Sequence, residues 1–268
     1  MNDHTFNTDK DDKSVNQSIK SRRIRKTICT LLLLGVMSAV IYGGMWFMAS
    51  YEPEMLSLIA MQTNDKVTVN ATDDYISFTP ISGTSRPGLL YYPGAKVEPE
   101  AYAVMAQRLA ETGVPVIIAK MPFNFAVLDA DKALSLKKTL GIADTWAIGG
   151  HSLGGSMAAK VAYENPNAFD ALILFASYPA GKSNDLSGSP LKVLSISGSR
   201  DAFVTKEKIN EKKPFLPQDT IYYDIEGGNH SQFGNYGLQK GDHVATIDSE
   251  SQMDLIVELV IAFMGGLQ

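Results

Sequence analysis

The segment GGHSLGGS, residues 149–156, constrains the fold of this 268-residue chain more than any other. It lies at the end of TWAIGG (145–150), an apolar run of strand length, and runs into LGGSMAAKVAYE (153–164), which has helical periodicity. A sharp turn from a strand into a helix brings the two elements very close, and only small side chains permit that approach. The segment therefore predicts a strand, a tight turn and a helix in immediate succession.

The same alternation of strands and helices extends over most of the chain. Two short β-rich runs, 66–70 and 75–80, form a hairpin-like pair, and apolar strands follow at 88–94, 114–122, 145–150, 169–179, 191–199 and 220–227. Helical periods occur at 99–112, 130–140, 153–164 and 248–264. Near-continuous apolar strands that alternate with helices are typical of a mostly parallel sheet covered on both faces. We predict an α/β fold with one domain over residues 66–268.

Composition excludes several classes of protein. The hydrophobic fraction of 45% and the charged fraction of 20% fit a globular protein and exclude a collagen or a wholly disordered chain. The net charge of -5 argues against a nucleic-acid partner, because phosphates favour a basic face. The single cysteine, Cys29, excludes an intrachain disulfide, and the four histidines lack the spacing of a zinc site. We expect no metal.

The N-terminal 50 residues differ from the rest. Residues 1–26 are polar and end in a basic cluster, which predicts a disordered cytoplasmic tail. Residues 27–50 contain no charge, and as a helix they would span about 36 Å, enough for a bilayer. The basic flank predicts that the N-terminus stays in the cytoplasm and that everything after residue 50 lies outside the membrane. Residues 51–65 would be a connector.

A cleaved signal peptide is the main alternative to a single-pass anchor in the cell membrane, and a buried core helix is a weaker one. The apolar run of 24 residues is longer than a signal-peptide core of about 7–15 residues, and no A-x-A site ends it. An uncleaved anchor is therefore favoured.

Residues 150–154, GHSLG, fit the G-x-S-x-G pattern in which a serine stands at the apex of a strand-to-helix turn. The pattern alone is a weak signal, but its position between a strand and a helix strengthens it. A glycine-rich loop that only packs or cradles phosphate is the alternative, although the G-x-G-x-x-G spacing is absent. We predict Ser152 as a nucleophile.

A serine hydroxyl needs a base, and the base needs an orienting acid. Asp201 follows the strand 191–199 and His230 follows the strand 220–227, in the chain order that this kind of site uses. Asp224 and Glu226 are competing acids, but Asp224 lies within a strand and Glu226 is too close to His230. We therefore predict Asp201 as the acid and His230 as the base.

Four segments carry a resemblance to a known family. YPGAKV (92–97), GHSLG (150–154), GSRD (198–201) and GNHSQFG (228–234) are similar to motifs of the α/β-hydrolase superfamily, over residues 66–268. More narrowly they resemble a bacterial branch related to dienelactone hydrolases. The resemblance implies that Ser152, Asp201 and His230 act as nucleophile, acid and base. Dienelactone hydrolases proper use a cysteine nucleophile, so their substrate is not carried over.

Two backbone N–H groups are expected to form an oxyanion hole, the Leu153 N–H and the Ala95 N–H. Lys96 is the adjacent alternative to Ala95, and the Pro-Gly pair before it could also be only a tight turn. Phe123, Phe125 and His151 are candidates for the substrate pocket, although the phenylalanines could equally be core residues and His151 could support the turn.

Residues 178–190 are too short for the helical lid that many lipases carry, which predicts an open site. These observations predict a membrane-anchored serine hydrolase that cleaves carboxylic esters or thioesters of small or short-acyl substrates without a cofactor. Its partners would be a small-molecule ester and the membrane, and nothing in the sequence indicates an oligomeric state. Two alternatives remain: an acyltransferase that uses the same triad on a cell-envelope acceptor, and a non-catalytic binding protein on a hydrolase fold.

Overall fold

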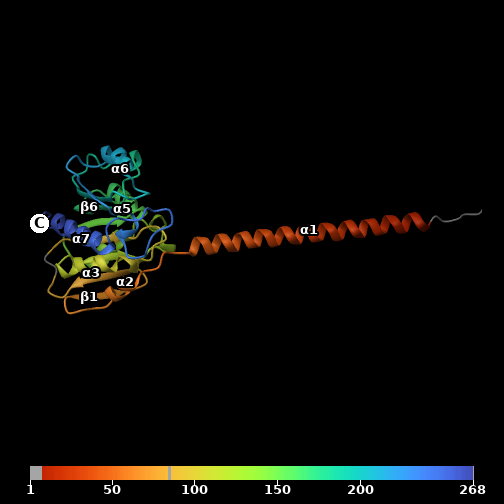
Figure 1. Ribbon diagram of the computed structural model, residues 1–268, viewed down its shortest axis with the longest axis horizontal. Helices are drawn as coiled ribbons and strands as arrows, with labels where there is room; N and C mark the ends of the chain where they lie inside the picture. The colour runs from red at the N-terminus through yellow and green to blue at the C-terminus, as the bar shows by residue number, and fades with distance from the viewer. Residues whose placement is uncertain (1–7, 84–85, 268) are drawn as a thin grey trace, which may run out of the picture. The chain divides into compact units, whose positions relative to one another are not determined.

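The structure, a computed structural model, describes residues 8–83 and 86–267 in two units that divide between Ala49 and Ser50 (Figure 1). The first contains one long helix, α1, Thr8–Met48. Its residues 25–45 are long and apolar enough to cross a membrane, a property that an N-terminal signal sequence shares.

Two boundaries in this unit differ from the prediction. Disorder was predicted for residues 1–26, but residues 8–26 are helical and residues 1–7 lie outside the described range. A helix extends at low cost from an existing turn, because each added residue gains a hydrogen bond without a new nucleus. The predicted span of 27–50 also ends too late, since α1 ends at Met48 and Ser50 belongs to the C-terminal unit.

An eight-stranded sheet with the order β1-β2-β4-β3-β5-β6-β7-β8 forms the centre of the C-terminal unit. The antiparallel strands β1 and β2 form one end, and β3 to β8 are parallel. The predicted, mostly parallel sheet is thereby confirmed. The strands are Val67–Ala71, Tyr75–Pro80, Gly88–Tyr92, Val116–Ala119, Trp146–His151, Ala171–Phe175, Lys192–Gly198 and Ile221–Ile225.

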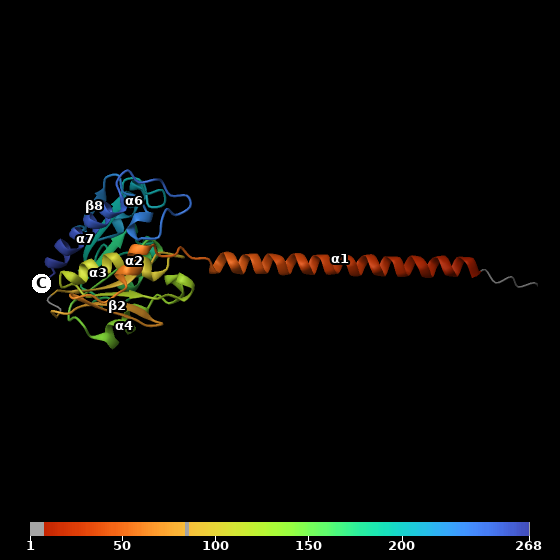
Figure 2. The same cartoon turned by 60° about the horizontal axis from the view of Figure 1, so that its bottom comes forward.

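Helices cover both faces of the sheet, as predicted. Alternate residues of β3 enter separate cores: Leu89 and Tyr91 pack with α3 and α7, whereas Leu90 and Tyr92 pack with α4 and α5. Figure 2 shows α3 and α7 together on one face. The helices are α2 (Met55–Ala60), α3 (Ala103–Glu111), α4 (Lys132–Leu140), α5 (Leu153–Glu164), α6 (Lys206–Lys212) and α7 (Ser249–Gly265).

Short turns make up the rest of the regular structure. The helix α2 lies within residues 51–65, where only a connector was predicted. Between β6 and β7, residues 176–191 contain a single 3-10 turn and no α-helix, so the predicted absence of a helical lid is confirmed. The 3-10 turns are Pro99–Tyr102, Pro122–Asn124, Ala126–Leu128, Lys182–Asn184, Lys213–Phe215 and Ser231–Phe233.

Candidate active site

Ser152 stands at the apex of the predicted turn, after the last residue of β5 and before the first residue of α5. Its backbone has φ 53° and ψ −122°, which is strained for a residue with a side chain. The flanking glycines have no room for a Cβ: one on Gly154 would lie 2.3 Å from the Tyr92 carbonyl oxygen, and one on Gly155 would lie 2.4 Å from that of Gly150. The small residues in the sequence are thus a steric requirement of the turn.

Hydrogen bonds hold this turn against the end of β6. The Ser152 N–H donates to the Phe175 carbonyl at 3.0 Å, and the Ser177 hydroxyl donates to the Ser152 carbonyl at 2.7 Å. The Ser156 hydroxyl donates to the Tyr178 carbonyl at 2.7 Å. The sequence reasoning missed Ser177, because nothing in the pattern of β6 separates it from an ordinary loop serine.

Backbone strain concentrates at one edge of the sheet. Of the six described non-glycine residues with positive φ, five lie after the C-terminal ends of β3, β4, β5 and β6, and they are Lys96, Phe123, Asn124, Ser152 and Ala176. Such conformations persist where the surrounding structure enforces them, and they cluster at functional sites. The predicted site residues lie at this same edge.

His230 and Asp201 form a buried pair in the loops after β8 and β7. The His230 Nδ1 lies 2.7 Å from the Asp201 Oδ2, and both residues are buried. The other oxygen of Asp201 accepts the N–H groups of Phe203 and Val204, each at 2.7 Å. With Nδ1–H directed at the carboxylate, Nε2 is the ring nitrogen of His230 that is left to accept a proton.

The pair lies beside the turn that carries Ser152. The ring of His151, the residue directly before Ser152, has its centroid 4.4 Å from that of His230. Asp224, the competing acid, accepts a hydrogen bond from the Ser197 hydroxyl at 3.0 Å within the sheet. The structure thus pairs the predicted acid with the predicted base and places the base beside the residue that precedes Ser152.

His151, the residue directly before Ser152, is buried and hydrogen-bonded beside the turn. It is fully buried, its Nδ1 lies 2.9 Å from the Tyr102 hydroxyl oxygen, and that oxygen accepts the Gly94 N–H at 2.9 Å. Burial, followed by the neighbouring His230, lowers the pKa of His151 well below its usual value, so the ring is neutral. Its ring packs into the core beside the turn, which fits the alternative that His151 supports the turn, and a role in the substrate pocket remains a prediction.

The loop after β3 presents one free backbone donor. Among the residues that the structure describes, neither the Ala95 N–H nor the Leu153 N–H has a hydrogen-bond acceptor. The Lys96 N–H donates to the Asn124 carbonyl at 2.9 Å, and this bond rules out the alternative donor. Ala95 and Leu153 remain the predicted oxyanion hole.

Two side chains that sequence reasoning missed fix the loop of His230. Gln252, fully buried on α7, accepts the Asn229 N–H at 3.0 Å and donates to the Asn229 carbonyl at 2.9 Å. Asp242 accepts both the N–H and the hydroxyl of Ser231, as well as the Ala202 N–H from the Asp201 loop. Neither residue stands in a recognisable motif, so only the folded structure reveals them.

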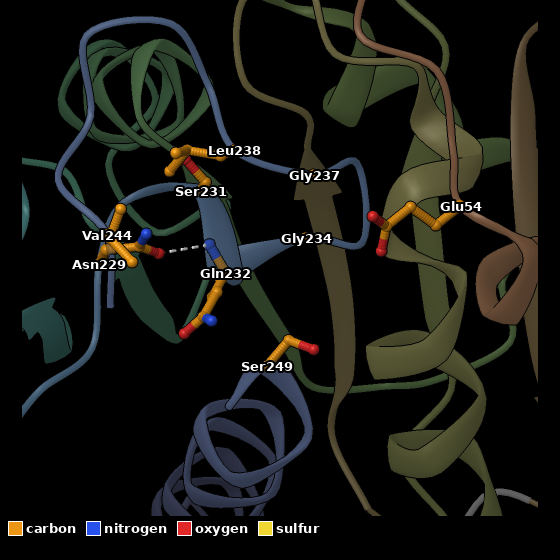
Figure 3. Close-up of a pocket in the computed structure, with 9 residues that line it drawn as sticks. All are labelled: Glu54, Asn229, Ser231, Gln232, Gly234, Gly237, Leu238, Val244 and Ser249. Carbon is orange, nitrogen blue, oxygen red and sulfur yellow. Dashed lines mark hydrogen bonds between the residues drawn. The ribbon is translucent and has the colours of Figure 1, made fainter. Parts of the chain in front are cut away.

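A pocket of about 240 Å³ adjoins the same loop, and Asn229, Ser231 and Gln232 contribute to its lining (Figure 3). Neither Ser152 nor His230 lines it, so it is not the reaction site. Phe123 is 58% exposed and Phe125 is partly exposed, and a role for them in the substrate pocket remains a prediction. No group of three or more His, Cys, Asp or Glu side chains within residues 8–83 and 86–267 is arranged to hold a metal ion.

The sequence profile of the alpha/beta hydrolase family matches residues 88–254, which include the strained turn and the buried pair. The chain belongs to the α/β hydrolase family. No curated protein sequence matches this hydrolase.

Solved structures with the same fold include dienelactone hydrolases. The hydrolase is 14% identical to the dienelactone hydrolase from Anabaena variabilis, with a TM-score of 0.58 over 74% of this chain and 99% of that one. The putative dienelactone hydrolase from Klebsiella pneumoniae gives a TM-score of 0.56 at 14% identity, over 75% and 99% of the two chains. A predicted CIB-like hydrolase from Thermoplasma acidophilum gives 0.53 at 14% identity, over 72% and 98%. At this level of identity the likeness establishes the fold.

Proposed function

We propose that this protein is a serine hydrolase that cleaves carboxylic esters or thioesters of small or short-acyl substrates through an acyl intermediate on Ser152. The observation that carries the proposal is the buried His230–Asp201 pair, 2.7 Å apart, beside a serine held at φ 53°. Families of α/β hydrolases host many reactions, so the argument rests on this site and not on the fold.

The proposed reaction has two stages, acylation of Ser152 and hydrolysis of the acyl-serine. The Ser152 oxygen attacks the acyl carbonyl while the His230 Nε2 takes the hydroxyl proton, and Asp201 stabilises the imidazolium that forms. The Ala95 and Leu153 N–H groups bind the oxyanion of the tetrahedral intermediate. The imidazolium then protonates the departing alcohol or thiol, and water, activated by the same nitrogen, releases the acid and frees Ser152.

Product analysis tests this proposal. The purified protein is given a p-nitrophenyl ester series of increasing acyl length, with and without a hydroxyl acceptor, beside Ser152→Ala and the control Ser187→Ala. Release of free acid that requires Ser152 supports a hydrolase, with the highest kcat/KM for short chains. Acyl transfer to the acceptor with little free acid would indicate an acyltransferase. No turnover by a folded protein would favour a binding role.

We also propose that α1 anchors the protein in the cell membrane, with its N-terminus in the cytoplasm. The support is the apolar segment 25–45 and the basic residues before it. The mass of the mature protein tests retention, because a cleaved signal peptide would remove the N-terminal residues. Protease added to intact cells should digest the C-terminal unit. If the topology were reversed, the protease would leave that unit intact.

A further inference from the structure

The segment that joins α1 to the C-terminal unit is bound to the loops after β3 and β4. The Ser50 hydroxyl accepts a hydrogen bond from the Asn124 side chain at 2.9 Å. The Tyr51 N–H donates to the Lys96 carbonyl at 2.6 Å, and the Glu98 N–H donates to the Tyr51 carbonyl at 3.0 Å. Lys96 directly follows Ala95, so the joining segment is fixed to the loop of the proposed oxyanion hole.

The same segment is bound to the loop after His230. The Tyr51 hydroxyl accepts the Lys240 N–H at 3.2 Å, and the Glu54 N–H donates to the Asn235 carbonyl at 2.8 Å. Figure 3 shows Glu54 and the loop residue Leu238 on the lining of one pocket. Residues 50–54 are therefore hydrogen-bonded both to the loop that contains Ala95 and to the loop that follows His230.

Exposed apolar side chains surround this attachment. On α2, which begins at Met55, Met55 is 69% exposed and Ile59 is 57% exposed, whereas Ser57 and Ala60 face the core. Further exposed apolar residues lie in two of the attached loops: Val127 and Leu128 after β4, and Leu238 and Val244 after His230. In Figure 2, α2 and the blue loop after His230 lie toward the same end of the C-terminal unit. We call Met55, Leu56, Ile59, Val127, Leu128 and Leu238 the apolar rim.

Chain length limits what can cover this rim. Met55, the first residue of α2, comes seven residues after Met48, the last residue of α1, and a chain reaches at most about 3.6 Å per residue, so α2 begins within about 25 Å of the end of α1. With α1 in a bilayer, the rim stays close to the lipid surface. An apolar face this near a bilayer gains free energy when its side chains enter the headgroup and acyl boundary.

We infer that the apolar rim contacts the surface of the bilayer that holds α1, and that the site takes ester substrates carried at that surface. The inference rests on the proposed anchor and on the proposed hydrolase. Contact with lipid would hold the loops of Ala95 and His230 beside the membrane, because residues 50–54 bind both. A small acyl group could then be removed from a molecule whose apolar part stays in the bilayer.

Spin labels test the contact directly. The full chain with Cys29→Ser is placed in vesicles of phosphatidylcholine and phosphatidylglycerol and labelled at Leu56→Cys or Ile59→Cys. Met37→Cys, within α1, reports insertion of the anchor, and Ile221→Cys, 53% exposed on β8, is the matched aqueous control. We expect collisions with oxygen to exceed those with a water-soluble nickel complex at positions 37, 56 and 59, and the reverse at 221.

The outcomes separate the proposals from one another. Aqueous labels at 56 and 59 with a lipid-embedded label at 37 overturn the rim alone, and an aqueous label at 37 overturns the anchor and the rim together. These readings do not depend on catalysis, so an inactive Ser152 leaves the contact result intact.

Activity tests the second part of the inference. Leu56→Glu with Ile59→Glu should lower turnover of a vesicle-borne ester at least tenfold and leave turnover of a soluble ester unchanged, and Ile221→Glu should change neither. An equal effect on both esters, or on neither, contradicts the substrate inference, and the soluble ester also reports whether the variant is folded.

Discussion

The Tyr102 hydroxyl should stabilise the fold and also position the loop of the proposed oxyanion hole. It accepts the Gly94 N–H at 2.9 Å and lies 2.9 Å from the His151 Nδ1, and all three groups are buried. Burial raises the pKa of Tyr102 well above 10, so the phenol keeps its proton and can donate it to His151. Tyr102→Phe removes this hydroxyl with almost no change in shape.

The loss of stability in Tyr102→Phe can be estimated from the two buried groups that lose their partner. Tyr102→Phe leaves a buried N–H and a buried ring nitrogen without their partner, and each such loss costs about 1–3 kcal/mol. We expect the free energy of unfolding to fall by about 2–4 kcal/mol. Because Gly94 directly precedes Ala95, we also expect kcat to fall at least about tenfold, but by less than the factor of about 10²–10³ that complete loss of an oxyanion donor costs.

Tyr91→Phe is the matched control. Tyr91 is also fully buried, and its ring centroid lies 5.0 Å from that of Tyr102, but within the described residues its hydroxyl has no hydrogen-bond partner. Removing an unsatisfied buried hydroxyl should leave stability unchanged or raise it.

Urea unfolding and ester turnover measure both variants. A fall in the free energy of unfolding of less than about 0.5 kcal/mol in Tyr102→Phe, or equal falls in the two variants, would refute the reasoning. Either result would mean that the hydrogen bonds of the Tyr102 hydroxyl do not stabilise the fold.

Three further predictions follow from other parts of the site. Because the pKa of His151 is lowered in the folded chain, the unfolded chain binds a proton below about pH 6.5 that the folded chain does not bind. The free energy of unfolding should therefore fall with decreasing pH by up to about 1.4 kcal/mol per pH unit. Urea titrations of His151→Gln should show a smaller slope. Gly154→Ala should lower the free energy of unfolding by about 3 kcal/mol or more despite the better helix propensity of alanine, since its Cβ would lie 2.3 Å from a backbone oxygen, whereas Gly188→Ala, which meets nothing within 4 Å, should unfold like the parent. Gln252→Met should leave the N–H and carbonyl of Asn229 unpaired and cost about 2–4 kcal/mol, and an unfolding midpoint like that of the parent would contradict its role in holding the His230 loop.

Sequence reasoning reached the fold because local and global signals agree over most of the C-terminal unit. The apolar run before Ser152 is a strand, the helix 153–164 has the predicted bounds, and a Cβ on any of the glycines on either side of Ser152 would lie under 3 Å from a backbone atom. Asp201 and His230 could be placed because parallel strands end at one edge of a sheet.

The rest depends on contacts between residues far apart in the chain. Tyr102 meets His151 across 49 residues, and Gln252 meets Asn229 across 23, so neither pair leaves a pattern in the sequence. The helix α2 has six residues, too few for a period to appear, and tertiary contacts decide whether so short a segment is helical. The sequence leaves two positions open for His151, because a neighbour of the nucleophile can point into the pocket or the core, and spacing alone does not choose between them.

The covalent capture of Ser152 tests the central claim most directly. The protein is treated with a fluorophosphonate, digested with trypsin and analysed by mass spectrometry, in which the peptide of residues 139–160 contains both Ser152 and Ser156. We predict phosphonylation of Ser152 alone, its loss in Ser152→Ala, strong slowing in His230→Ala and Asp201→Asn, and parent-like labelling in His243→Ala, whose histidine is exposed. A folded protein that remains unlabelled at Ser152, or that labels equally fast without His230, would contradict the proposed triad.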